Sequence, residues 1–135
     1  EPYRANVTRV AVDARELAEF AGRNVSGEDP YVRASVLLAE ASIAAAEDRR
    51  SEATKRFREA LRLLEEERAP LVCAETRLDL ARALRRFEDW EGARVELEQA
   101  RGTFERMGAN ALVGEIDREL SEVANRAGVA GPIHP

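Results

Sequence analysis

The feature that most constrains the fold of this chain is an internal repeat with a spacing of about 40 residues. Small and acidic residues and one leucine recur unchanged at this spacing, and two large apolar positions recur as Phe57 with Leu97 and Leu64 with Phe104. The unchanged residues are Ala41, Ala53, Ala60, Glu65, Ala69, Glu75 and Leu80, which recur as Ala81, Ala93, Ala100, Glu105, Ala109, Glu115 and Leu120. A period in this range is typical of two-helix units that bury their apolar faces against neighbours. The repeat therefore predicts an all-α fold of stacked antiparallel helical hairpins.

Apolar residues at helical spacing predict about six helices. Their expected bounds are about 4–21, 30–47, 51–67, 70–87, 90–107 and 110–127. Pro30 and Pro70 suit the first turn of a helix, and Gly108 suits the position after the last turn. The fifth apolar stripe contains Trp90, Ala93, Leu97, Ala100, Phe104 and Met107, so we expect Trp90 in the core. We expect one domain over residues 1–128 and a flexible tail over residues 129–135.

Composition excludes several classes of protein. The net charge is −5, which argues against direct nucleic-acid binding, because such binding needs clustered positive charge. No run of about 18 apolar residues exists, so no membrane span is expected. Cys73 is the only cysteine; it lies in an apolar stretch of a predicted helix, which predicts a buried, inert thiol and fits a reducing cytoplasm. The chain has no initiator Met and no signal-peptide pattern, and we expect a segment of a longer cytoplasmic protein.

No arrangement of residues typical of catalysis is found. His134 is the only histidine and lies next to the end of a tail that contains proline and glycine, where no rigid partner can orient it. The sequence has no cluster of Cys and His for a metal, no glycine-rich phosphate loop and no nucleophile beside a base. We therefore predict no catalytic residue, no metal and no cofactor.

The stretch from Leu84 to Ala93 resembles the turn between the two helices of a tetratricopeptide-like repeat. Ala81, Ala93 and Ala100 follow the small-residue pattern of that family, and the resemblance covers about residues 31–127. The sequence departs from the family in four ways. Its period is about 40 residues where the family has about 34, the glycine beside the first small position is absent, the late proline is missing from the second unit, and Ser121 replaces the third small residue. The resemblance implies a superhelix of helical hairpins whose first helices line a concave groove.

A narrower resemblance is carried by Glu91-Gly92-Ala93-Arg94 and by the segment from Phe104 to Ala109. These residues, with the acidic, arginine-rich helix that follows, are similar to the helical-repeat region of large bacterial regulators of the LuxR type and the AfsR-like group. Similar repeats follow some bacterial nucleotide cyclases. The resemblance implies a sensor or interaction role in transcription regulation or signalling, with the chemistry in other domains.

The groove that the tetratricopeptide resemblance implies yields a candidate binding site. Its residues on the helix expected at 70–87 and on the helix expected at 110–127 are Leu78, Arg82, Arg85, Arg86, Arg118, Glu122 and Arg126. Arginine binds carboxylates through paired donors, so a protein with an acidic peptide or helix is the expected partner, including a sibling domain of the same full-length chain. The alternative is ordinary solvated arginines, with Arg82 paired to Asp79 three residues earlier.

Three functions remain open at this level. The first is a non-catalytic protein–protein interaction module that binds a partner in the groove. The second is self-association as a homodimer, because the expected first helix has the character of the second member of a hairpin and lacks its own partner. The third is a small-ligand sensor, for which the alanine-rich helix at 30–47 would leave space.

Overall fold

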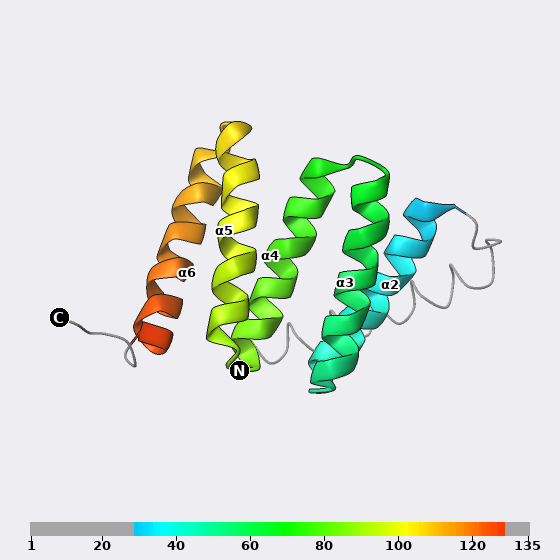
Figure 1. Cartoon of the computed structure of the whole chain (residues 1–135), viewed down its shortest axis with the longest axis horizontal. Coiled ribbons are helices and arrows are strands. Elements are labelled where there is room, and N and C mark those ends of the chain that lie inside the picture. The colour runs from blue at the N-terminus through cyan, green and yellow to red at the C-terminus, as the bar shows by residue number, and fades with distance from the viewer. Residues whose placement is uncertain (1–28, 129–135) are drawn as a thin grey trace. The chain divides into compact units, whose positions relative to one another are not determined.

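The computed structural model describes residues 29–128, which form five α-helices joined by short turns (Figure 1). The helices are α2 (Pro30–Ala46), α3 (Arg50–Glu66), α4 (Pro70–Arg86), α5 (Trp90–Arg106) and α6 (Asn110–Gly128). No strand occurs within this range, so the all-α prediction is confirmed. The expected helix over residues 4–21 and the expected tail over 129–135 lie outside the described residues.

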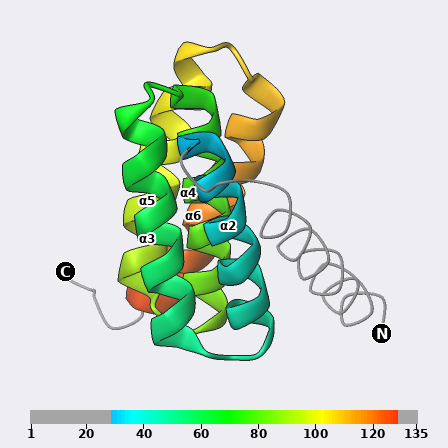
Figure 2. The same ribbon diagram turned by 90° about the vertical axis from the view of Figure 1, so that its right-hand side faces the viewer.

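The described residues divide into two compact units, with the boundary between Ala69 and Pro70. In the first unit, α2 packs against α3 as an antiparallel hairpin (Figures 1 and 2). In the second unit, α5 packs against both α4 and α6. The hairpin-like packing of successive helices is therefore confirmed within each unit, and a single domain over 1–128 remains a prediction.

All four turns between the helices have the same geometry. The helices begin at Pro30, Arg50, Pro70, Trp90 and Asn110, so their starts are evenly spaced along the chain. In each turn one residue takes a positive φ, namely Asp48 (60°), Arg68 (56°), Glu88 (66°) and Gly108 (75°). At the first turn the amide of Arg49 donates to Ala44 O (2.8 Å) and that of Asp48 donates to Ala45 O (3.1 Å), and the other turns repeat this pair of bonds. These are the two bonds of the Schellman motif, which satisfy carbonyls at the end of a helix. Each repeat of the sequence thus contains two structural repeats of half its length.

Aspartate side chains begin two of the helices. Asp29 Oδ1 accepts a hydrogen bond from the amide of Tyr31 (2.9 Å), and Asp89 Oδ1 accepts one from the amide of Gly92 (3.0 Å). Each bond satisfies an amide that has no partner inside its helix, which stabilises the helix start. Pro30 follows the first of these caps and occupies the first helical turn, as the sequence predicts.

The recurrent small residues lie at buried helix positions. Ala53, Ala60, Ala93 and Ala100 are fully buried, and Phe57 and Leu97 are buried beside them. Alternation of large and small side chains is what close packing of helices requires. Cys73 is buried, as predicted.

Two residues at the ends of the predicted fifth stripe, Trp90 and Met107, do not join this core. The side chain of Met107 is 50% exposed, and Met107 follows the last residue of α5, Arg106, as its C-terminal cap.

Candidate functional site: the arginine–glutamate cluster of α4 and α6

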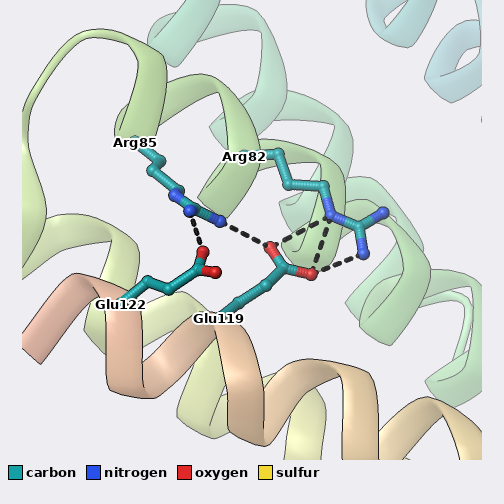
Figure 3. Close-up of polar contacts among 4 residues, drawn as sticks. All are labelled: Arg82, Arg85, Glu119 and Glu122. Carbon is teal, nitrogen blue, oxygen red and sulfur yellow. Dashed lines mark hydrogen bonds and ion pairs between the residues drawn. The ribbon is translucent and has the colours of Figure 1, made fainter.

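Four charged side chains of the second unit converge between two helices that are not adjacent in sequence. Arg82 and Arg85 extend from α4, and Glu119 and Glu122 extend from α6 toward them (Figure 3). We call these four residues the arginine–glutamate cluster. The sequence predicted three of them as candidate site residues and missed Glu119.

Arg82 and Glu119 form the most complete pair of the cluster. Arg82 Nη2 lies 2.7 Å from Glu119 Oε2, and Arg82 Nε lies 3.3 Å from both carboxylate oxygens. A guanidinium that donates through two nitrogens to one carboxylate forms a strong and directional ion pair. The hydrogen bond with Glu119 is the main cause of a raised pKa of Arg82.

Arg85 bridges the two carboxylates of the cluster. Its Nη1 lies 3.5 Å from Glu119 Oε1, and its Nη2 hydrogen-bonds to Glu122 Oε1 (Figure 3). Arg85 therefore depends on Glu122 for its close carboxylate contact, whereas Glu119 is held mainly by Arg82.

Helical spacing explains why the four side chains match. Arg82 and Arg85 are three residues apart on α4, and Glu119 and Glu122 are three residues apart on α6, so each pair lies on one face of its helix. Both main contacts join residues separated by 37 positions. The repeat is about 40 residues long, so the contact of each arginine lies three residues, about one helical turn, before its equivalent position in the next repeat.

The two glutamates differ in exposure. The side chain of Glu119 is 15% exposed and that of Glu122 is 58% exposed, while the side chains of Arg82 and Arg85 are 45% and 33% exposed. Glu119 is thus a partly buried anchor of the cluster, and Glu122 is a carboxylate at its solvent edge.

The pairing of Arg82 differs from the local alternative expected from the sequence. Its hydrogen bonds go to Glu119 on α6, and not to Asp79 one turn earlier on α4. Asp79 is still close enough for Arg82 to lower its pKa, but desolvation has the larger effect and the pKa of Asp79 is raised.

The structure places the other predicted site residues around the cluster in different ways. Leu78 is buried, so its side chain contributes to helix packing. Arg86 and Arg118 are exposed. The guanidinium of Arg126 lies over the ring of Trp90, with its Cζ 5.4 Å from the ring centroid. As partner contacts all these residues remain predictions.

Trp90 is not the core residue that its place in the apolar stripe suggests. It is half-buried at the first position of α5, and Arg126 of α6 covers its ring. A guanidinium over an aromatic face is attracted by the negative charge of that face, and the contact joins the start of α5 to the end of α6.

Further ion pairs hold the three helices of this unit together. On α5, Arg101 Nε lies 2.5 Å from Asp117 Oδ1 on α6, and its Nη1 lies 3.3 Å from Glu105 Oε1. The hydrogen bond from Arg101 is the main cause of a lowered pKa of Asp117. Between α4 and α5, Arg77 Nη1 lies 2.9 Å from the buried carboxylate of Glu96. These contacts position α4 and α6 for the cluster.

The chemistry available in this region is the binding of carboxylates by guanidinium groups. Among residues 29–128, no group of three or more His, Cys, Asp or Glu side chains is placed to hold a metal ion. No helix in the same part of the chain is long and apolar enough to cross a membrane. No family model, curated protein or solved structure matches the chain.

Proposed function

We propose that this chain is a non-catalytic protein–protein interaction module that binds an acidic segment of a partner at the arginine–glutamate cluster. The observation that supports this proposal is the geometry of Arg82 and Arg85, whose guanidinium groups already bind carboxylates in Glu119 and Glu122. A partner with aspartate or glutamate side chains offers the same chemical group. Arginine suits this role because its planar donors match a carboxylate.

The placement of the arginines on a helix also supports binding. Both lie on α4, where Ala81 and Leu84 are buried, and α6 is anchored by the fully buried Ile116 and Val123. Contact residues on packed helices keep their geometry better than residues on loops. An acidic partner would therefore meet a largely preformed surface.

The wider setting is proposed from the sequence resemblance. We propose that the hairpins form a tetratricopeptide-like solenoid that belongs to a larger cytoplasmic bacterial regulator of transcription or signalling. In that setting the acidic partner is another protein or a sibling domain of the same chain. The internal repeat of the sequence and the hairpin-like packing of the helices support the solenoid.

Site-specific photocrosslinking in cells tests the proposed function. A photoreactive amino acid replaces Arg86 or Arg118, which flank the cluster and are exposed. We expect adducts to acidic segments, and we expect Arg82→Glu or Arg85→Glu to remove them while the helical circular dichroism persists. Gln99, an exposed residue of α5, is the control position. Adducts that survive both charge reversals, or that form equally at Gln99, would contradict the proposal.

Self-association is a second candidate, and a difference between α4 and α6 favours it. Leu80, Ala81 and Leu84 are buried on α4. One repeat later, Leu120 is half-buried, and Ser121 and Ala124 are exposed on α6. A second copy that packs on this face of α6 would cover it. We expect a dimer mass in sedimentation equilibrium that Ala124→Arg lowers, and a monomer mass at all concentrations would exclude this candidate.

A further inference from the structure

Glu122 lies among cationic side chains. Arg85 contacts it from α4. On α6 itself, Arg118 precedes it by four residues and Arg126 follows it by four, which places both on the same face of the helix one turn away. Glu122 is therefore an exposed carboxylate that pairs with Arg85 of α4 and has an arginine one turn before it and another one turn after it on α6.

The contacts of Arg85 are unequal. Its close hydrogen bond goes to Glu122, while Glu119 lies 3.5 Å from it and is held at 2.7 Å by Arg82. If Glu122 turned away, Arg85 Nη2 would lose its carboxylate and Arg82 would keep its own. Arg85 Nη2 could then donate a hydrogen bond to a carboxylate of another molecule.

Rotation of one side chain is sufficient for this exchange. The backbone of α6 is held by Ile116 and Val123, both fully buried, and by the ion pair between Asp117 and Arg101. The side chain of Glu122 is 58% exposed, so solvent can reach it. An ion pair of such exposure contributes a factor of roughly five or less to an equilibrium, so a partner carboxylate can compete with it.

We propose that Glu122 is an internal substitute for the partner's carboxylate, which occupies Arg85 until an acidic protein segment replaces it. This inference rests on the proposed function and adds its control and the chemistry of its partner. Arg85 stays paired with one carboxylate throughout, because the carboxylate of the partner takes the place of the Glu122 side chain as that side chain turns toward solvent. A segment with several acidic residues gains further contacts with Arg118, so it outcompetes a single intramolecular glutamate.

The test compares binding of fluorescein-labelled hexaglutamate to the wild-type chain and to Glu122→Gln by fluorescence anisotropy. We expect the substitution to lower the dissociation constant by roughly threefold, which corresponds to removal of one weak competing surface ion pair. Labelled hexaglutamine should not bind. The double variant Glu122→Gln with Arg85→Gln should bind no more tightly than the wild type, because the donor freed by the first change is absent.

Glu105→Gln is the matched control. Like Glu122, Glu105 is an exposed carboxylate that shares its arginine with a second carboxylate, here Arg101 with Asp117. It changes the net charge by the same amount at the opposite end of the three-helix unit. We expect it to leave the affinity for hexaglutamate within twofold of the wild type.

The outcomes separate this inference from the proposed function. Wild-type binding that depends on Arg85 but is not strengthened by Glu122→Gln overturns the inference and leaves the interaction module in place. Absence of binding in both the wild type and Glu122→Gln overturns both. Equal strengthening by Glu105→Gln shows an effect of net charge only and overturns the inference. Tighter binding of a single-stranded oligonucleotide of equal charge overturns the assignment of an acidic protein segment.

Discussion

The carboxylate of Asp89 occupies the space that a side chain on Gly92 would need. A Cβ added to Gly92 would lie 2.5 Å from Asp89 Oδ2 and 2.9 Å from Asp89 Cγ. The same carboxylate accepts a hydrogen bond from the amide of Gly92 at 3.0 Å. The absence of a side chain at residue 92 therefore allows the cap of α5 to close over the helix end.

This relationship predicts that Gly92→Ala does not stabilise the protein. Alanine is favoured over glycine inside a helix by about 1 kcal/mol, but here it displaces an aspartate cap worth about 1 kcal/mol. Gly102 on the same helix is the control, because a Cβ there meets only Arg106 Nη1 at 3.6 Å. Urea denaturation should show a gain of about 1 kcal/mol for Gly102→Ala and no gain for Gly92→Ala. Equal gains would show that the cap is unimportant.

The positive φ angles of the turns lead to a second prediction. Glu88 has a φ of 66° and Gly108 a φ of 75° at equivalent positions of two turns. A left-handed conformation costs a residue with a side chain about 1 kcal/mol relative to glycine. A Cβ on Gly108 would meet no atom within 4 Å, so any penalty there comes from the backbone alone.

We therefore expect Glu88→Gly to raise the free energy of unfolding and Gly108→Ala to lower it, each by about 1 kcal/mol at most. Glu67→Gly is the control, because Glu67 has a φ of −82° and gains nothing from glycine. Denaturation midpoints of the three variants check the prediction. Destabilisation of the protein by Glu88→Gly as large as that caused by Glu67→Gly would contradict this prediction.

The unequal exposure of the two glutamates of the cluster leads to a third prediction. Double-mutant cycles with glutamine should give a coupling energy of about 1 kcal/mol between Arg82 and Glu119, because Glu119 is partly buried and accepts hydrogen bonds from two nitrogens of Arg82. The coupling between Arg85 and Glu122 should be below about 0.5 kcal/mol, because Glu122 is exposed and water screens it. A larger coupling for the second pair would contradict the distinction between anchor and edge carboxylate.

Helix existence and pairing could be predicted from the sequence because they depend on local patterns. Pro30, Pro70 and Gly108 mark helix ends, and the small residues Ala53 and Ala93 mark the packed faces. The predicted helices from the second to the fifth each end one residue too late, as at Met107, because that residue caps the helix and is not part of it.

The turns and the cluster were harder to predict, for a physical reason. Asp48, Arg68 and Glu88 adopt a left-handed conformation that is unusual for charged residues, so the sequence alone does not indicate it. The only indication is that Gly108 occupies the equivalent position in the last interhelical turn. Glu119 was missed because its partner lies on a helix two elements away. The repeat contained a usable signal, since Glu119 corresponds to Asp79 and its spacing from Glu122 matches that of the two arginines.

The ion pair between Arg101 and Asp117 leads to a prediction of pH dependence. The hydrogen bond from Arg101, partly opposed by desolvation, lowers the pKa of Asp117 in the folded chain. An aspartate whose pKa is lower when folded stabilises the fold fully above its unfolded pKa of about 4. That stabilisation is lost as the pH falls through the lower folded value.

We therefore expect Asp117→Asn to reduce the free energy of unfolding at pH 7 and to have a progressively smaller effect below pH about 4. Guanidinium chloride would screen the ion pair, so urea denaturation in low salt between pH 7 and pH 2.5 is the suitable measurement. Glu105→Gln, which removes the longer contact of Arg101 (3.3 Å), serves as the control and should change this profile less. A difference between wild type and Asp117→Asn that persists unchanged into acid would mean that Asp117 acts through packing and not through its charge.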